Sequence, residues 1–162
     1  MKTVWRIATE APAYPADDFS GDGAYRHGGR WNRSGTSVLY CTGSVALACL
    51  ETLAHVRIGR PLANKSLVRL DIPEELWQTA SRYSTDTIPV GWDAIPPGKT
   101  SHDFGENWIA EARSAILVVP SVIAPEECNI LINPYHADWQ CIRGRKTRKW
   151  LYDPRLLQQR ST

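Results

Sequence analysis

The sequence has no long apolar run and little net charge, and these two absences exclude several classes of protein. No window approaches the roughly 20 consecutive apolar residues that a membrane-spanning helix needs. The N-terminal residues, which include Trp5, Arg6 and Glu10, contain no apolar stretch typical of a secretory signal. The formal net charge of +2 is too small to indicate nucleic acid as the main partner. We therefore expect a chain that has no membrane segment and does not bind nucleic acid directly.

Cysteine pairs and metal-ligand spacings are also lacking. The four cysteines form no C-x-x-C pair, and two of them lie in apolar runs, where cysteine acts as a small buried hydrophobe. Only four histidines are present and no two lie at ligand spacing, so His136 and Asp138 alone do not predict a metal site. We expect no metal, and we expect the reducing environment of the cytoplasm.

The length predicts a single domain that comprises residues 1–162. A hydrophobic fraction of 43% and a charged fraction of 22% are ordinary for a globular protein. There is no internal repeat and no low-complexity segment. The chain is therefore long enough to bury a core without disulfides or a metal.

The most informative stretch is Arg30–His55. It predicts a turn rich in glycine and arginine, a short strand at Ser37–Cys41, and a helix from about Ser44 to His55. Thr42 and Ser44 are hydroxyl residues at the helix entry, where they can accept from free N–H groups of the first turn. The helix is apolar on nearly every side, which is typical of a helix buried in a core.

One carboxylate, Glu51, interrupts this apolar helix. An unpaired carboxylate is costly to bury, so Glu51 must lie beside a cation, a donor or an open cleft. The nearest candidate partners in the sequence are Arg30, Arg33 and His55. A narrow polar edge on the helix would also explain Glu51. Together with Arg30 from the turn and Tyr40 from the strand, however, Glu51 could converge on a cleft that holds a nucleotide.

The rest of the chain alternates predicted strands with short helices and loops. Further strands are expected at Thr3–Ala8, Ser66–Asp71, Ala115–Pro120 and Asn129–Asn133. A short helix is expected to begin at Pro73, and a longer helix is expected to run from an N-cap at Asp103 to about Ser114. A turn is expected at Arg57–Asn64, and loops are expected at Ala11–Gly29 and Tyr83–Ser101. A loop as long as Tyr83–Ser101 is often a lid or a binding element, although a passive connection would have the same composition. The run Arg143–Lys149 has five basic residues in seven, and it is either a solvated face or a surface for an acidic partner.

Two sequence patterns resemble the RES domain family. The first is G-G-R-W-N…G…V-L-Y-C…S-x-A-L-A-x-L-E-x-L-x-H, which begins at Gly28 and ends at His55. The second is VVPSVIAPEECNILINPYHADW, at Val118–Trp139, and the early W-R-I at Trp5–Ile7 fits the opening strand of the family. The patterns occur in the family's order and cover most of the chain.

This resemblance implies a fold, an activity and a partner. The fold would be α+β and ADP-ribosyltransferase-like, with central sheets flanked by helices. The protein would be the toxin of a type II toxin–antitoxin system that degrades NAD+, with inorganic phosphate as co-substrate and no further cofactor. An Xre-type antitoxin would block the active site, and a homodimer within that complex is left open.

The resemblance also assigns residues to the site. It places Arg30, Tyr40, Glu51 and Ser121 among the catalytic residues, and Arg6, Arg30, Tyr40 and Asn129 among those that bind the dinucleotide. Arg30 and Arg6 would hold phosphate, because a guanidinium matches phosphate oxygens. Tyr40 would line the nicotinamide pocket, and Glu51 would stabilise an oxocarbenium-like ribose or orient its hydroxyls. Without the resemblance, Arg6 could be a solvated strand residue and Tyr40 a core residue.

Ser121 follows directly after a predicted strand. No His–Asp relay surrounds it in the sequence, and it lacks the G-x-S-x-G elbow of hydrolases. We therefore expect it to act through hydrogen bonds and not as a nucleophile.

The residues leave the acceptor of the ADP-ribosyl group open. With phosphate as acceptor, the reaction is phosphorolysis to nicotinamide and ADP-ribose 1″-phosphate, and with water it is glycohydrolysis. One alternative is a mono-ADP-ribosyltransferase that modifies a macromolecule. A second is a catalytically inactive module that only binds a nucleotide.

Overall fold

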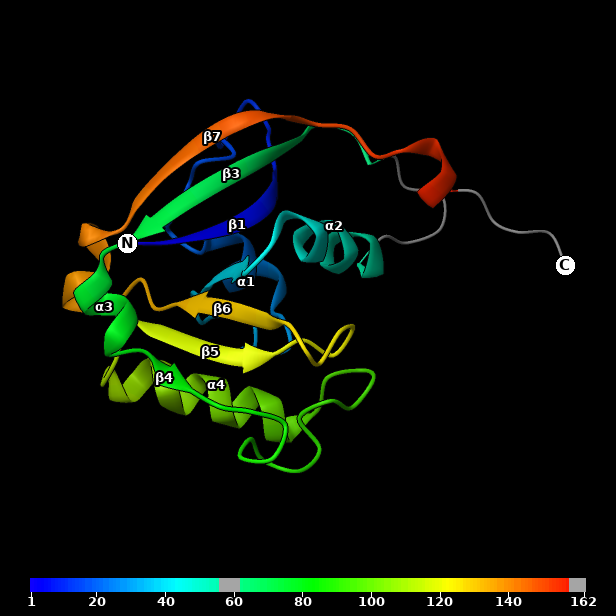
Figure 1. Cartoon of the computed structure of the whole chain (residues 1–162). Helices are drawn as coiled ribbons and strands as arrows, with labels where there is room; N and C mark the ends of the chain where they lie inside the picture. The colour runs from blue at the N-terminus through cyan, green and yellow to red at the C-terminus, as the bar shows by residue number, and fades with distance from the viewer. Residues whose placement is uncertain (56–61, 158–162) are drawn as a thin grey trace, which may run out of the picture.

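The computed structural model describes residues 1–55 and 62–157 (Figure 1). Their strands form one seven-stranded sheet in the order β4-β5-β6-β2-β1-β3-β7. The strands are β1 (Lys2–Thr9), β2 (Leu39–Thr42), β3 (Lys65–Ile72), β4 (Ser81–Arg82), β5 (Ile116–Pro120), β6 (Cys128–Ile132) and β7 (Arg143–Trp150). Neighbouring strands are antiparallel except for β4 and β5, which are parallel. The four strands expected from the sequence, together with the one before the central helix, are confirmed within two residues at each end.

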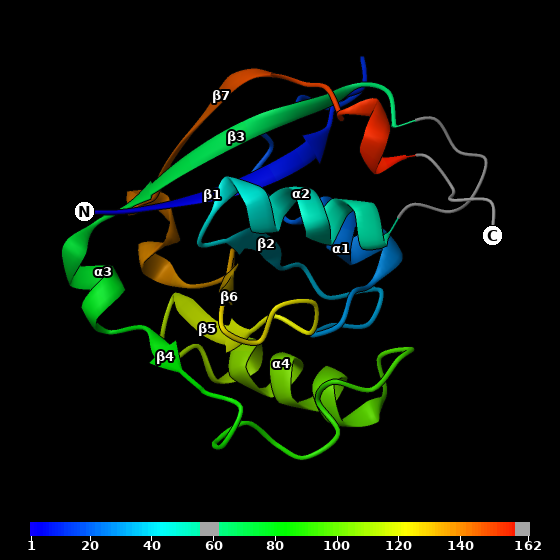
Figure 2. The ribbon, with the colours of Figure 1, turned by 45° about the vertical axis from the view of Figure 1, so that its right-hand side comes forward.

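Four α-helices accompany the sheet in the described residues. They are α1 (Asp22–His27), α2 (Val45–Ala54), α3 (Glu74–Gln78) and α4 (Lys99–Glu111), and two short 3-10 helices follow at Ala137–Cys141 and Pro154–Leu156. Figures 1 and 2 show α4 against β5 at one end of the molecule, and α2 near β1 and β2. None of the helices in residues 1–55 and 62–157 has the length and apolar character that crossing a bilayer requires.

The sheet consists of two ladders that meet at one residue pair. β1 pairs with β3 along its whole length, from Lys2 to Thr9. In contrast, β1 and β2 share only the pair Trp5 and Thr42. Beyond this pair the two strands separate, and the ladder of β1, β3 and β7 lies apart from the ladder of β2, β6, β5 and β4 (Figure 1).

Two apolar clusters fill the space on either side of β5 and β6. One cluster joins the two ladders, and it includes Val4, Val68, Ile116 and Ile130. The other lies between the opposite face of β5 and β6 and helix α4, and it includes Trp31, Trp92, Trp108, Leu117 and Leu131. Both faces of β5 are covered, so every residue of this strand is buried. This burial explains why the sequence of the strand is continuously apolar.

Helix α2 confirms one expectation and contradicts another. Its N-cap is Ser44, whose hydroxyl accepts from the backbone N–H of Leu47 at 3.1 Å, as the sequence predicts. The expectation that the helix is buried on nearly every side is wrong, because only Leu47 and Ala48 are buried and Leu50 is 43% exposed. An apolar sequence therefore overstated the burial of this helix. The turn expected at Arg57–Asn64 lies largely outside the described residues.

Two other local predictions need correction, and one strand was not predicted. The loop expected at Ala11–Gly29 contains α1, whose glycine-rich sequence concealed a helical turn held by an ion pair between Asp22 and Arg26. Helix α4 begins after Gly98 and not after Asp103, because the carboxylate of Asp103 binds Lys99 and Arg33 instead of capping the helix. The basic run at Arg143–Lys149 is an edge strand, which its lack of alternating apolar residues concealed.

Candidate active site

The carboxylate of Glu51 is held by two side chains from the other end of the chain. Its Oε1 accepts a hydrogen bond from the hydroxyl of Ser121 at 2.8 Å and from the amide Nδ2 of Asn129 at 2.7 Å. Ser121 follows β5 and Asn129 lies in β6, and the pairing of Val119 with Asn129 brings these two positions together. Both donors use the same oxygen, and within the described residues Oε2 receives no hydrogen bond. The cluster therefore fixes one oxygen of Glu51 and leaves the other for a ligand.

Ser121 is itself oriented by the backbone. Its Oγ accepts from the backbone N–H groups of Ile123 at 3.1 Å and Ala124 at 3.3 Å, so its own proton points to Glu51. This is the hydrogen-bonding role that the sequence predicts for Ser121. The structure places no histidine relay against it in the described part of the chain, so a nucleophilic role has no support.

The cations suggested as partners of Glu51 lie elsewhere or make other contacts. Arg33 pairs with Glu106 at 2.5 Å and with Asp103 at 2.7 Å. The ring of His55 contacts the backbone carbonyl of Glu51 at 2.7 Å and not its carboxylate. Of the partners that the sequence allowed for Glu51, which were a cation, a donor or an open cleft, the described residues supply donors, from Ser121 and Asn129. The distance of these two residues along the chain hid the contact from local sequence patterns.

Arg30 lies close enough to Glu51 for their charges to interact, but its hydrogen bonds go to a loop. One terminal nitrogen donates to the backbone carbonyls of Trp92 and Ala94, each at 2.8 Å. Burial lowers the pKa of Arg30, and the charges of Glu51 and Asp93 oppose this effect, so the guanidinium stays charged. Arg30 therefore joins the site to the segment between β4 and α4.

That segment is anchored and not a free loop. Trp92 is buried and its ring stacks on Trp31, with centroids 6.3 Å apart. Trp31 also meets Phe104 of α4 edge to face, at 5.7 Å. These contacts hold the carbonyls that bind Arg30, so the direction of its guanidinium is fixed by the core around α4.

Tyr40 has both hydrogen-bonding functions of its hydroxyl occupied. The hydroxyl donates to Oδ1 of Asn32 at 2.8 Å and accepts from the backbone N–H of Trp31 at 2.9 Å. Gly29 makes room for this arrangement, because a Cβ at that position would lie 2.6 Å from the hydroxyl. Burial raises the pKa of Tyr40 well above its usual value, so the phenol is neutral. Tyr40 thus offers a fixed ring surface and no free proton.

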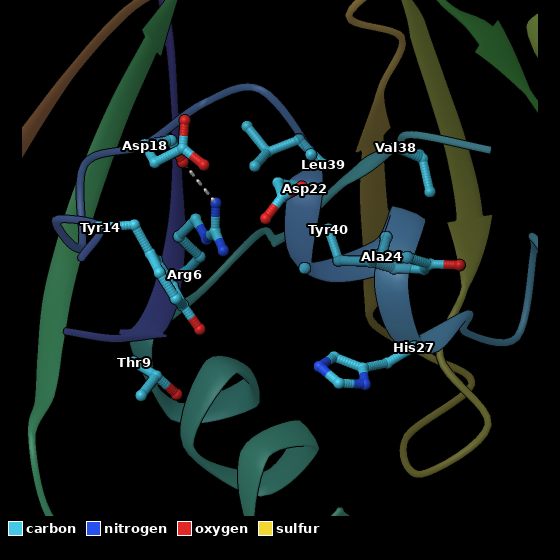
Figure 3. Close-up of a pocket in the computed structure, with 12 residues that line it drawn as sticks. Arg6, Thr9, Tyr14, Asp18, Asp22, Ala24, His27, Val38, Leu39 and Tyr40 are labelled. Carbon is cyan, nitrogen blue, oxygen red and sulfur yellow. Dashed lines mark hydrogen bonds between the residues drawn. The ribbon is translucent and has the colours of Figure 1, made fainter. Parts of the chain in front are cut away.

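A cavity of about 330 Å³ opens where β1 and β2 separate (Figure 3). Arg6 reaches into it from β1, and Tyr40 forms part of its wall from β2. The sequence left open whether Arg6 faces solvent or a cleft, and the structure places it in this cavity. One terminal nitrogen of Arg6 donates to the carbonyl of Asp18 at 3.3 Å. Burial lowers the pKa of Arg6, and the neighbouring Cys41 and Asp18 oppose this effect.

The site also contains polar atoms that the protein leaves without partners. Four buried side-chain polar atoms lack a hydrogen bond among the described residues, and two of them are Nε of Arg6 and Oδ1 of Asn129. Each such atom costs roughly 1–3 kcal/mol when it stays unpaired. Both atoms have almost no exposed surface, so a ligand would reach them only if the side chains moved. Arg6 lines the cavity and Asn129 does not.

The sequence did not identify three further residues of the cavity wall. Tyr14, Asp22 and His27 all line the cavity, and Figure 3 shows His27 across from Arg6. All three lie in the segment that the sequence classified as loop. The available signal was its glycine content next to Arg30, which favoured a close approach to a ligand but could not select individual side chains.

Comparison with solved structures defines the class of fold. The chain is similar to a protein of the Mycobacterium tuberculosis MbcT–MbcA toxin–antitoxin complex, with a TM-score of 0.63 at 17% identity over 91% of this chain and 84% of that one. This confirms the expected α+β, ADP-ribosyltransferase-like fold. At such low identity the likeness concerns the fold alone.

The particular family follows from the sequence match. The model of the RES domain matches residues 3–153, so the chain belongs to the RES domain family. It is 50% identical over 155 residues, 96% of both chains, to the "Prs ADP-ribosylating toxin" of Sphingobium sp. strain YBL2. It is also 34% identical, over 88% of this chain and 93% of the relative, to "Toxin Res" of Yersinia enterocolitica. A "Toxin Res" of Pseudomonas putida is 32% identical over 85% and 88% of the two chains.

Proposed function

We propose that this protein is the toxin of a toxin–antitoxin pair and that it cleaves NAD+ at the bond between nicotinamide and ribose. The observation that carries the proposal is the geometry of Glu51, with one oxygen held by Ser121 and Asn129 and the other without a hydrogen bond from the described residues. Membership of the RES family and the names of its toxin relatives support it. Because NAD+ of the host is the substrate, the toxin would act in the cytoplasm.

In this reaction the bond between C1′ of the ribose and the ring nitrogen breaks. The electron pair goes to the cationic nicotinamide ring, which leaves neutral, and positive charge develops on the ribose. The second oxygen of Glu51, Oε2, would stabilise that charge. Because the hydrogen bonds to Oε1 already hold the carboxylate in place, the carboxylate needs little reorganisation as the charge forms. An acceptor then attacks C1′ and loses its proton.

Arg30 and Arg6 would bind the diphosphate of NAD+. Both guanidinium groups are charged and partly buried, which strengthens their attraction for an anion. The terminal nitrogens that Arg6 and Arg30 do not use in hydrogen bonds to the described residues would donate to phosphate oxygens. The fixed ring of Tyr40 would form a wall of the nicotinamide pocket. No metal or further cofactor has a part in this scheme.

The acceptor of the ADP-ribosyl group distinguishes two versions of this function. Transfer to phosphate or water would destroy NAD+ outright, which is what the family resemblance implies. Transfer to a protein has a specific finding in its favour, because the relative with 50% identity is named for the ADP-ribosylation of Prs. We therefore place protein modification first for this chain, with Prs as the candidate acceptor.

One incubation separates these versions. NAD+ labelled in its adenosine half is mixed with the pure protein, with and without phosphate and with and without Prs of the host, and products are identified by mass spectrometry. We expect release of nicotinamide and label on Prs. Label confined to ADP-ribose or its 1″-phosphate would exclude Prs as acceptor and identify an NAD+-degrading enzyme. Binding of NAD+ without any nicotinamide release would indicate an inactive module.

A partner protein is the other part of the proposal. The MbcT–MbcA complex and the toxin relatives support an antitoxin for this chain. We propose that it is of the Xre type and that a carboxylate of it occupies the phosphate position at Arg30 and Arg6, since both groups bind the same guanidinium fork. Competition tests this: a tight complex that still binds and cleaves NAD+ at the rate of the free toxin would contradict direct blockade. A homodimer within the complex stays a prediction.

A further inference from the structure

Strand β7 carries an excess of positive charge at one edge of the sheet. It is the last strand of the order β4-β5-β6-β2-β1-β3-β7, and in the described residues its only strand neighbour is β3. Figure 1 shows it along the outer margin of the molecule. Five of its eight residues are basic and exposed, namely Arg143, Arg145, Lys146, Arg148 and Lys149.

Little of this charge is neutralised by the described residues. Lys146 binds Glu10 at 2.7 Å, which is the one ion pair of the strand in that part of the chain. Arg148 lies over the ring of Trp150 at 4.6 Å. Arg143 and Arg145 form no ion pair within residues 1–55 and 62–157. The edge thus presents cations of which only Lys146 is in an ion pair among the described residues, although the charge of Arg145 also helps to lower the pKa of Asp71.

The arginines of β7 share one face of the strand. In the pairing with β3, Arg143 is opposite Asp71, Arg145 is opposite Arg69, and Arg148 follows after a bulge. The other face is covered at Gly144, where the ring of Phe19 lies so close that a Cβ would come within 2.0 Å of it. The exposed row therefore consists of arginine side chains, next to a backbone edge that pairs with no further strand among the described residues. One carbonyl of this strand, that of Lys149, accepts from the guanidinium of Arg148 at 3.1 Å.

The NAD+ site does not account for this surface. β7 is two strands away from β1, which carries Arg6, and none of its residues lines the cavity. Charged side chains on an edge strand commonly protect it from pairing with other strands. All the charges of this strand have the same sign. Three of them are guanidinium groups, which can bind a carboxylate through two parallel hydrogen bonds.

We propose that β7 docks an acidic, extended segment of a partner protein, which adds to the sheet as a further strand. The backbone edge would supply main-chain hydrogen bonds, and the arginine row would select carboxylate side chains at alternate positions of the segment. A nucleic acid could match the charges, and its phosphates could accept from backbone N–H groups, but it could not form the alternating N–H and C=O ladder of a strand. The combination of the two features therefore favours a polypeptide.

The direct probe is a fluorescent peptide of alternating glutamate and valine, matched in length to β7. It should bind the whole protein in low salt, and hydrogen exchange of β7 amides that do not bond β3 should slow on binding. Two control peptides separate the contributions. One carries N-methyl groups on alternate backbone nitrogens and keeps its charge, and the other has lysine in place of glutamate. Each should bind roughly tenfold weaker or not at all, a difference of about 1.4 kcal/mol.

Matched variants place the binding on β7. Arg143→Glu with Arg145→Glu should weaken the acidic peptide by roughly tenfold or more. Arg113→Glu with Arg155→Glu changes net charge by the same amount at two exposed arginines outside β7, and should leave binding within about twofold. Arg143→Ala with Arg145→Ala is a milder change, because it removes the two charges without reversing them. Circular dichroism checks that each variant folds. NAD+ cleavage should be unchanged in all of them, so this test is independent of the proposed function.

Several outcomes would overturn the proposal. Absence of peptide binding would do so, as would equal weakening by both charge-reversed pairs, which would indicate net charge alone. Tight binding of the N-methylated peptide without slower exchange in β7 would exclude strand addition. Displacement of the peptide by a short DNA duplex of equal or higher affinity would make the edge a nucleic-acid surface instead.

Discussion

The Glu51 site and strand β7 are both charged, but they differ in how their charged groups are held. Glu51 is a single carboxylate whose one oxygen is held by two neutral donors from distant strands. Strand β7 has five cations and one ion pair among the described residues. A charge that is oriented and partly buried serves a reaction in which position matters. Charges that are exposed and unpaired serve association, where they attract and select a partner.

The largest expected effect comes from the carboxylate itself. Glu51→Gln keeps the shape and an acceptor oxygen for Ser121, but removes the charge that would stabilise the ribose. We expect nicotinamide release to fall by roughly 10³-fold or more, as for loss of a main electrostatic group. Chromatographic assay of nicotinamide measures this, and circular dichroism checks the fold. Full turnover by folded Glu51→Gln would remove Glu51 from the chemistry.

Replacement of Arg30 should have the next largest effect. Arg30→Lys keeps the charge but loses the planar fork, together with at least one of the bonds to the carbonyls of Trp92 and Ala94. We expect about 10²-fold lower kcat/KM, which corresponds to about 2.7 kcal/mol. Activity within about twofold of the parent would show that Arg30 only balances charge.

The donors to Glu51 should matter less than Glu51 itself. Asn129→Ala and Ser121→Ala each remove one hydrogen bond to a charged group, with an expected cost of about 1.5–3 kcal/mol, or roughly 10- to 100-fold in kcat. Steady-state kinetics should show kcat lowered more than KM is raised, because these residues orient the carboxylate. If KM rises and kcat does not change, Asn129 would bind NAD+ directly, as the sequence resemblance implies.

A fourth test concerns the room that Tyr40 needs. Gly29→Ala would place a Cβ 2.6 Å from the Tyr40 hydroxyl, so we expect a loss of about 1–3 kcal/mol in the free energy of unfolding. Gly23→Ala is the matched control, because a Cβ at Gly23 meets nothing within 4 Å and its helical position favours alanine. Urea denaturation compares the two variants. Equal stability would mean that Tyr40 can shift without cost.

The smallest effect is expected at the one neutralised cation of β7. Hydrogen bonds from Lys146 and Ser66 lower the pKa of Glu10 below its usual value. A lowered carboxyl pKa stabilises the fold at pH above the unfolded value of about 4.5, and this contribution is lost as pH falls through the folded value. In Lys146→Met the pKa of Glu10 should rise, which NMR titration can follow. An unchanged pKa would mean that Ser66 alone holds the carboxylate.

The sequence predicted the strand that carries Tyr40 and the helix that carries Glu51 better than it predicted the contacts of these two residues. The strand with Tyr40 and the helix with Glu51 were recognised because hydrophobic pattern and capping are local signals, and Ser44 caps α2 as expected. The partners of Glu51 could not be found in this way. Ser121 and Asn129 are 70 and 78 residues away in the chain, and only strand pairing brings them to α2.

The edge strand was missed for a different physical reason. A strand at the margin of a sheet buries little, so β7 shows no alternation of apolar and polar residues. Its pairing with β3 is visible only in the fold. The same lack of burial left two interpretations of the basic run open, and charge counting could not choose between them.

The single pair between Trp5 and Thr42 has a consequence for how the cavity can recognise a ligand. The carbonyl of Trp5 accepts from the hydroxyl of Thr42 at 3.3 Å, so this edge of β1 faces β2. Backbone groups of alternate residues point to the same edge of an antiparallel strand, so those of Thr9, which lines the cavity, point to the side on which the two strands separate. Contacts made by peptide groups persist when side chains change. A chain can keep such a contact through extensive sequence divergence, as long as the two strands separate at the same point.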